Sequence, residues 1–371
     1  MKNMITRCTA LICAISASLL LTTSAHQKQV APQIEVCFVL DTTGSMSGLI
    51  EGAKQKIWSI ANEMATAKPT PHIKFGLVAY RDRGDEYVTK THKLTDDLDE
   101  IYSKLKTFSA DGGGDTPESV NEALDEAISQ MEWSQSRDVL KIVFLVGDAP
   151  PHMDYQGGPD YHKLCERAVK KDILINTIQC GTISETTPVW KEIARLAEGK
   201  YLAIEQSGGM IAVSTPFDGD INRINRELGK TIVAYGDTRK RASVLAKQEM
   251  SESAAPAAAA DRLSLNAKNR IVVQGGGDLI DAINQGDMTI ETATASKLSD
   301  EYKDLSTSEL KKVVEGKSEA RALLQKELRQ LDEKRTAYIR EESKKSGSSQ
   351  SFDSNVSSTI KEQAKKKGIK Y

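Results

Sequence analysis

Short apolar runs alternate with amphipathic segments along most of the chain. The runs at 34–40, 73–80, 139–146 and 173–179 are rich in β-branched residues, which is typical of parallel strands that are buried on both faces. Between the first two runs, residues 47–67 place apolar side chains three and four positions apart, as a helix with one buried side does. Strands that alternate with helices predict right-handed crossovers and a doubly wound, mainly parallel α/β sheet flanked by helices.

Weaker patterns complete this α/β region. Residues 87–94 alternate only loosely, so we expect an edge strand or hairpin partner there, and residues 201–204 are expected to form a short final strand. Further helices are predicted at 95–108, 117–131, 160–171, 188–197 and 221–235.

The composition changes after residue 236, where the expected α/β domain at 33–236 ends. Residues 237–261 contain a Ser-Glu-Ser-Ala-Ala-Pro sequence and an alanine run, which predict a linker that could be helical in part. Residues 262–371 are expected to form an α-rich C-terminal region.

A long charged helix is predicted at about 306–345 in this region. Ser306 and Glu309 have the spacing of a capping box that opens it. We expect a helix packed on one side or a weak coiled coil through which oligomers could form, because basic residues break the heptads. The interrupting residues are Lys317, Arg321 and Arg335.

The first 25 residues differ in kind from the rest. Lys2 and Arg7 precede an apolar run at 10–21, and small residues follow it up to Ala25, which predicts a signal peptide at 1–25. The run is shorter than the ~20 residues of a spanning helix, and no later run is long enough, so we expect no membrane span in the mature chain. The protein is therefore expected to be exported, either periplasmic or extracellular.

The net charge bears on the class of binding partner, and the cysteine count bears on disulfide bonds. The formal net charge is −2 and 27% of the residues are charged, which favours a soluble globular protein and gives no reason to expect nucleic acid as a partner. Cys37, Cys165 and Cys180 remain after the leader. An odd number cannot all pair, so we expect buried thiols, although an oxidising compartment allows one bridge.

Oxygen-bearing side chains follow three of the predicted elements. Asp41, Thr43 and Ser45 come directly after the first strand, Thr116 stands between a glycine loop and a helix, and Asp148 follows the next strand. In an open parallel sheet, ligands bind at the carboxyl ends of the strands. Carboxylates and hydroxyls without Cys or His suit Mg²⁺ or Mn²⁺ rather than Zn²⁺.

In this order, Asp41-x-Thr43-x-Ser45, Thr116 and Asp148 resemble the metal-ion-dependent adhesion site (MIDAS) of the von Willebrand factor type A (VWA) family, whose motif is Asp-x-Ser-x-Ser with a distant Thr and a distant Asp. Thr43 replaces the first Ser and keeps its hydroxyl. The resemblance covers Gln33 to Tyr235 and, together with the leader, suggests an exported bacterial-type protein with a VWA domain.

The resemblance implies a division of roles. Thr43 and Ser45 would be direct metal ligands, Asp41 and Asp148 would bind directly or through water, and Thr116 would be the ligand that changes between states. In members of the family an open coordination position typically accepts a Glu or Asp of a partner protein. The implied function is therefore a metal-dependent protein-binding or adhesion module.

Three more residues are candidates for the second shell or rim of the site. Asp115 precedes Thr116, Arg81 follows the second strand and could bind a ligand carboxylate, and His152 comes shortly after Asp148. Each has a plainer alternative, namely an exposed turn acid, a salt-bridged loop and a surface histidine.

Enzymatic alternatives find less support. Phosphotransferases of the haloacid dehalogenase type need a second Asp where Thr43 stands, and neither Gly112-Gly113-Gly114 nor Gly275-Gly276-Gly277 has the ending of a phosphate-binding loop. We therefore expect no enzyme. Two alternatives to the binding module stay open: an assembly protein whose metal only orders loops while the C-terminal helix makes the contacts, and a metal-dependent hydrolase.

Overall fold

The computed structural model describes residues 31–371 except 211, 294–296 and 347–350. The predicted signal peptide lies outside the described residues. Within them, every helix is too short or too polar to cross a bilayer. Within the described residues Cys37, Cys165 and Cys180 are buried free thiols, so the expected buried thiols are present and the one bridge left open is not formed.

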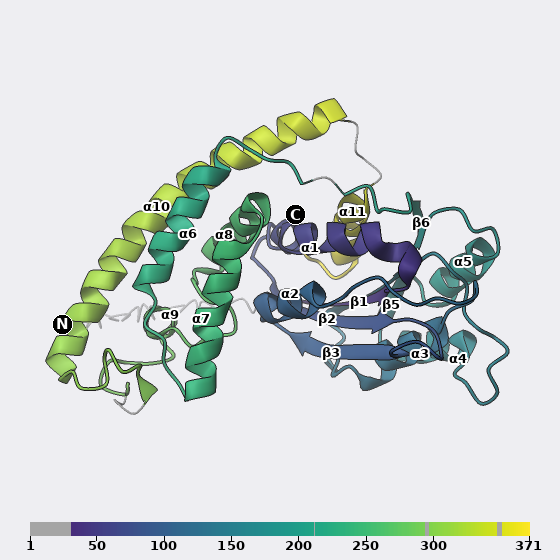
Figure 1. The fold of residues 1–371 in the computed structure, drawn as a ribbon, viewed down its shortest axis with the longest axis horizontal. Coiled ribbons are helices and arrows are strands. Elements are labelled where there is room, and N and C mark those ends of the chain that lie inside the picture. Colours follow the sequence, from purple (N-terminus) through teal and green to yellow (C-terminus); the bar gives the residue numbers. More distant parts are fainter. Residues whose placement is uncertain (1–30, 211, 294–296, 347–350) are drawn as a thin grey trace, which may run out of the picture. The chain divides into compact units, whose positions relative to one another are not determined.

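A six-stranded sheet in the order β3-β2-β1-β4-β5-β6 organises the structure (Figure 1). All neighbouring strands are parallel except β2 and β3, so the predicted doubly wound fold is confirmed. The strand order reverses at β1, which lies between β2 and β4, and the carboxyl ends of β1 and β4 therefore flank the switch point of the sheet. The strands are β1 (Gln33–Asp41), β2 (His72–Tyr80), β3 (Thr89–Thr95), β4 (Leu140–Gly147), β5 (Ile173–Cys180) and β6 (Tyr201–Ile204).

Helices cover both faces of this sheet. Successive residues of β1 point to opposite faces, and both faces are apolar. Phe38 and Leu40 enter the core under one layer, and Cys37 and Val39 enter the other. The first layer contains α1 (Ser47–Met64), α2 (Leu98–Lys106) and α11 (Phe352–Lys366). The second contains α3 (Val120–Asp125), its π-helical continuation η2 (Glu126–Gln130), α4 (Tyr161–Lys170) and α5 (Thr186–Leu196).

Helix α11 differs from the predicted domain boundaries, since residues 352–371 belong with the sheet and not with the rest of the C-terminal region. Phe352 is 2% exposed and packs on Phe38 of β1, with 6.1 Å between the ring centroids. Gln363 of α11 exchanges side-chain hydrogen bonds with Asn176 of β5. A segment from the end of the described chain thus completes one hydrophobic layer of the α/β domain.

The predicted linker at 237–261 is also different in the structure, where it forms α7 (Thr238–Ser253) and the start of α8 (Pro256–Asn269). The alanine run at 257–260 is buried, with no residue more than 8% exposed. Small side chains let α8 approach α1 and α6 (Asp218–Thr231) closely, and the tertiary contacts make this segment helical.

The long predicted helix is present as α10 (Thr307–Ser346), which packs on α6, α8 and α9 (Leu279–Gln285) (Figure 1). Its capping box is confirmed, because the Ser306 N–H donates to Glu309 Oε2 over 2.8 Å and the Glu309 N–H donates to Ser306 Oγ over 3.3 Å. Arg321 and Arg335, expected to interrupt the apolar stripe, are only 1% and 4% exposed. Arg321 pairs with Asp278 and Asp281, and Arg335 pairs with Asp218 and Asp261.

Candidate functional site

Asp41 is the last residue of β1, and the loop after the strand curls around its carboxylate. Oδ1 accepts hydrogen bonds from the Thr43 N–H (2.8 Å) and from Thr43 Oγ1 (2.6 Å). Oδ2 is buried and accepts no hydrogen bond from any described residue. A buried carboxylate oxygen without a donor is costly, so this atom points to a ligand of positive charge.

Two more predicted residues lie beside this carboxylate. Ser45 Oγ is 3.4 Å from Thr43 Oγ1. Asp148, directly after β4, accepts a hydrogen bond at Oδ2 from Gln206 Nε2 over 2.8 Å, and the same nitrogen is 3.3 Å from the Ser45 carbonyl oxygen. Gln206 therefore joins the loop after β1 to the loop after β4.

The glycine loop that carries Thr116 packs against the loop after β1. The Gly44 N–H donates to the Gly112 carbonyl over 3.3 Å. A Cβ at Gly113, whose φ is +83°, would lie 3.3 Å from Thr43 Cβ, so the two loops touch. Thr116 itself is exposed and makes no hydrogen bond to the described part of the chain. The structure thus places all five predicted ligands on three adjoining loops.

Glu118 adds a carboxylate that we did not predict for the site. It is 3% exposed, and its Oε2 also lacks a partner among the described residues. Burial, followed by the nearby charge of Asp41, raises the Glu118 pKa to about 9. Burial also raises the pKa of Asp41 to about 7. The hydrogen bonds from Thr43 oppose this rise, and the charge of Asp148 adds a smaller rise.

These acids lie close to one another and lack a cationic side chain as partner among the described residues. Within the described chain, no Lys or Arg donates a hydrogen bond to Asp41, Asp148 or Glu118. Gly147 permits the close packing here, because a Cβ there would overlap the Tyr80 hydroxyl and lie 3.0 Å from Asp41 Oδ2. The unsatisfied carboxylate oxygens fit a small divalent cation with oxygen ligands.

Arg81 follows β2 as expected. Its side chain is 2% exposed and donates to the carbonyl oxygens of Thr42 (3.2 Å) and Ser109 (2.8 Å). The guanidinium therefore ties together the loops that carry the site, and its Nη1 lies 3.7 Å from Glu86 Oε2, as in the salt-bridged loop that was the plainer alternative. Asp115 and His152, the other two rim candidates, lie together in a second cluster that is described below.

Glu118 and Gln206 are the residues that sequence reasoning missed. Glu118 stands at the start of a helical segment, where an acid is favoured by the helix dipole alone, so its position carried no separate signal. Gln206 follows β6 in a loop without a motif. Only the distances in the folded chain connect either residue with Asp41.

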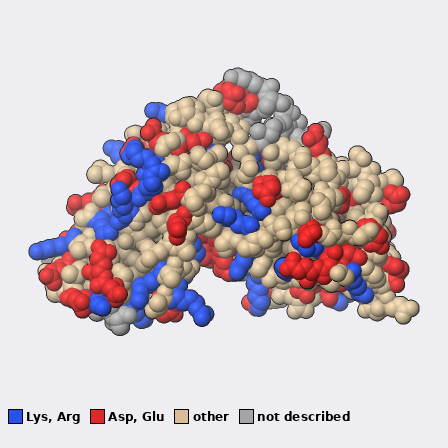
Figure 2. Space-filling view, viewed as in Figure 1, with Lys and Arg blue, Asp and Glu red and all other residues tan. Residues whose placement is uncertain are grey.

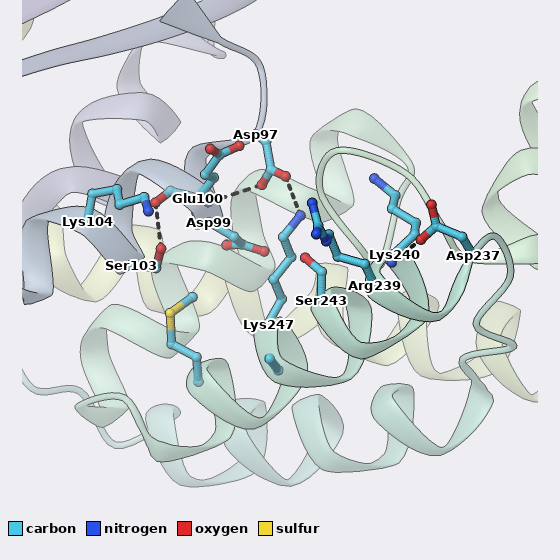
Figure 3. A pocket seen from close by; sticks show the side chains of 12 residues that line it. Asp97, Asp99, Glu100, Ser103, Lys104, Asp237, Arg239, Lys240, Ser243 and Lys247 are labelled. Carbon is cyan, nitrogen blue, oxygen red and sulfur yellow. Dashed lines mark hydrogen bonds and ion pairs between the residues drawn. The ribbon is translucent and has the colours of Figure 1, made fainter. Parts of the chain in front are cut away.

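A cleft of about 510 Å³ between α2 and α7 is a second place where a ligand could bind (Figure 3). Its charged groups are largely satisfied by the chain: the Lys247 ammonium points at Asp97 and also bonds the Gln274 carbonyl, and Lys240 bonds the Gly275 carbonyl. Asp97 follows β3, which runs antiparallel to β2. The cleft is therefore at the opposite edge of the sheet from Asp41.

Surface charge differs between the helical part of the chain around α10 and the part that contains the sheet. Figure 2 shows Lys and Arg side chains gathered along α10 and acidic side chains gathered on the part of this face that covers the sheet.

The fold and these loops define an α/β domain with a cluster of acidic residues at the switch point of its sheet. Residues 35–215 match the family model described as von Willebrand factor A domain, so this chain contains a VWA domain and the predicted resemblance to that family is confirmed at the level of the domain. The match ends before α6. VWA domains are typically protein-interaction modules, and many occur in extracellular proteins.

Several known proteins share this domain. von Willebrand factor A domain-containing protein 7 of Rattus norvegicus is 34% identical over 122 residues, which are 33% of this chain and 12% of the relative. Alpha-protein kinase vwkA of Dictyostelium discoideum is 27% identical over 134 residues, which are 36% of this chain and 20% of the relative. The chain thus spans only a small part of the length of these relatives.

Among solved structures, proximal thread matrix protein 1 from the mussel byssus with a zinc-occupied MIDAS motif is similar over 47% of this chain and 42% of that chain, with 18% identity and a TM-score of 0.36. The SpRpn10 VWA domain is similar over 47% of this chain and 89% of that chain, with 15% identity and a TM-score of 0.36.

Proposed function

We propose that this protein is an exported, metal-dependent binding module that captures an acidic side chain of a partner protein through a divalent cation. Asp41, Thr43, Ser45, Thr116 and Asp148 would hold the cation. The observation that carries the proposal is the buried Asp41 carboxylate, which has one oxygen fixed by Thr43 and the other oxygen unsatisfied next to further acids.

The donor set is suited to Mg²⁺ or Mn²⁺. Both are hard cations that prefer oxygen ligands in octahedral coordination, and Mg²⁺ usually keeps several waters. When bound, the cation supplies a coordination position that a Glu or Asp carboxylate of the partner can take from water.

The residues of this chain prepare that site in three ways. Thr43 fixes one oxygen of Asp41, and Gln206 fixes Oδ2 of Asp148. Burial and then the charge of Asp41 raise the pKa of Glu118 to about 9, so this group lies beside the site in its protonated form at neutral pH and adds no further negative charge. Arg81 keeps the loops in register through their carbonyl groups.

The helical part supports a second element of the proposal. Helix α10 and its neighbours would space or assemble the binding domain, because they offer a rigid scaffold held by buried ion pairs. The predicted leader would direct the protein to the periplasm or the exterior.

Calorimetric titration of Mg²⁺ and Mn²⁺ tests the metal site directly. Wild type should bind one ion of either metal, and Thr116→Ala and Ser45→Ala should bind more weakly or not at all. Thr66→Ala is the matched control, because Thr66 is an exposed threonine at the end of α1 that bonds only the Glu63 carbonyl.

The same variants test partner capture. An immobilised peptide rich in Glu and Asp should retain wild type in Mg²⁺ and release it when a chelator is added, while Ser45→Ala should not be retained. Equal metal binding by wild type and both site variants would refute the assignment of the ligands. Retention that survives chelation would refute metal-dependent capture.

A further inference from the structure

We propose that Asp82, Asp115 and His152 form a second divalent cation site, beside the MIDAS residues and separate from them, that takes a nitrogen-binding transition metal such as Zn²⁺. One ligand atom from each of these three side chains lies within 4.8 Å of the others. None of the three is part of the proposed MIDAS.

The three residues come from three loops at the carboxyl edge of the sheet. Asp82 follows β2, Asp115 belongs to the glycine loop, and His152 follows β4. Backbone hydrogen bonds fix the last two loops to each other, since the Glu118 N–H donates to the Pro150 carbonyl (2.9 Å) and the His152 N–H donates to the Glu118 carbonyl (3.0 Å). The position of His152 is therefore set by the fold.

His152 is the observation that points to a ligand. Its side chain is 7% exposed, and Nε2 lies 3.4 Å from Asp82 Oδ2 and 3.8 Å from Asp115 Oδ2. Nε2 is buried and makes no hydrogen bond within the described chain. The imidazole thus aims an unsatisfied nitrogen at two carboxylates, and the space between these atoms suits a cation.

The other ring nitrogen explains which tautomer is present. Nδ1 lies 2.8 Å from Asp154 Oδ1, and a carboxylate acceptor there places the proton on Nδ1. In that tautomer the lone pair is on Nε2, which faces the cluster. A carboxylate behind a histidine is the usual device that orients a metal-binding imidazole.

Asp82 is oriented in a similar way. Ser119 Oγ donates to Asp82 Oδ1 over 2.9 Å, and the Tyr155 hydroxyl bonds the same carboxylate. The Tyr155 ring stacks on His152 with 4.1 Å between centroids. Asp115, in contrast, has a side chain that is 62% exposed, so one side of the site opens to solvent.

The ligand types select the metal. Two carboxylates and one imidazole suit Zn²⁺ better than Mg²⁺, because Mg²⁺ prefers oxygen alone. Three protein ligands leave a fourth position of a tetrahedral ion to water or to a partner group. The site differs in this respect from the all-oxygen set around Asp41.

Competition for Zn²⁺ against a fluorescent chelator, in excess Mg²⁺ that fills the MIDAS, tests the proposal on the full chain. Wild type should bind one Zn²⁺, and His152→Ala should lower zinc affinity at least about tenfold, since even residues behind the ligands contribute that much. Asp115→Asn should also weaken binding, and this exposed position leaves the fold intact. His162→Ala is the matched control, because His162 also bonds an aspartate but is 47% exposed on α4.

Asp41→Ala separates this site from the MIDAS. It should retain zinc affinity while it loses Mg²⁺ binding, so a failure of the proposed function leaves the zinc result readable. Equal zinc affinity of wild type, His152→Ala and Asp115→Asn would overturn the second site. Loss of zinc binding in Asp41→Ala but in neither of those variants would place the zinc at the MIDAS and would overturn it as well.

Discussion

Replacing Asp41 by Asn should stabilise the metal-free protein at pH 7.5 and abolish its stabilisation by Mg²⁺. Asn has the same shape and keeps an acceptor for the two Thr43 donors, which lie 2.8 and 2.6 Å from Oδ1. It removes a negative charge from a carboxylate whose Oδ2 has no partner among the described residues. A residue at the centre of a metal site is thus expected to destabilise the protein when the metal is absent.

The magnitude follows from the pKa of Asp41, which burial raises from 3.8 to about 7. At about 1.36 kcal/mol per pKa unit, ionising this group in the folded state costs up to about 4 kcal/mol. The Asn amide N–H₂ must find an acceptor in the same place, and an unsatisfied donor costs about 1–3 kcal/mol. We therefore expect a net stabilisation of roughly 1–3 kcal/mol at pH 7.5.

The pH dependence has a definite sign. Between pH 4 and 7 the folded protein holds a proton that the unfolded chain has lost, so the stability of the metal-free protein falls as the pH rises through this window. The part of this loss that comes from Asp41 should be about 2.5 kcal/mol between pH 5 and pH 7.5 and should be absent in Asp41→Asn. The part that comes from the raised pKa of Glu118 has the same direction and should remain in both proteins.

Urea unfolding followed by tryptophan fluorescence provides the assay. Trp58, Trp133 and Trp190 are all at most 5% exposed, so their emission reports the α/β domain. Each protein is measured in chelator and in Mg²⁺ at both pH values. The reasoning is refuted if Asp41→Asn is less stable than wild type in chelator at pH 7.5, or if Mg²⁺ stabilises both proteins equally.

Three further outcomes are expected. Binding of Mg²⁺ at pH 7 should release protons, because the pKa of Asp41 is about 7 in the free site. Calorimetric titration in two buffers of different ionisation enthalpy measures this release, and equal heats in both buffers would contradict it. Arg321→Ala should lower the free energy of unfolding, measured in urea, by about 3–5 kcal/mol, since it leaves Asp278 and Asp281 as buried acids without their cation. Lys311→Ala removes an exposed ion pair on the same helix and should lower it by less than about 1 kcal/mol. Phe352→Ala should destabilise the α/β domain by about 3–5 kcal/mol, because the ring is buried against Phe38. Leu323 is 71% exposed, so Leu323→Ala should change the stability little. Similar effects of the two substitutions would show that α11 does not belong to the core.

The sheet could be predicted because each buried strand is a continuous apolar run, and the five ligands could be predicted because they follow such runs in order. Residues 257–260 left the choice between a linker and a helix open, since alanines show no helical periodicity even where they are buried. Arg321 and Arg335 broke the apolar stripe, and only their acidic partners on other helices explain why they are buried.

The site was predictable to the same extent. Asp41, Thr43 and Ser45 are close in sequence, so their spacing carries the motif. Glu118 and Gln206 join the site through contacts between distant loops, to which no local pattern corresponds. The sequence offered His152 only as a possible rim residue, because its burial and the direction of Nε2 depend on the backbone pairing between its loop and Glu118.

Helix α11 has a consequence for how the protein is made. The layer of apolar side chains that includes Phe38 and Phe144 stays partly uncovered until residues 352–369 have left the ribosome, after all of the helices from α6 to α10. The nascent chain must therefore carry an open hydrophobic face while the whole helical part is synthesised. The export proposed above would fit this order, because the late closure delays complete folding of the α/β domain.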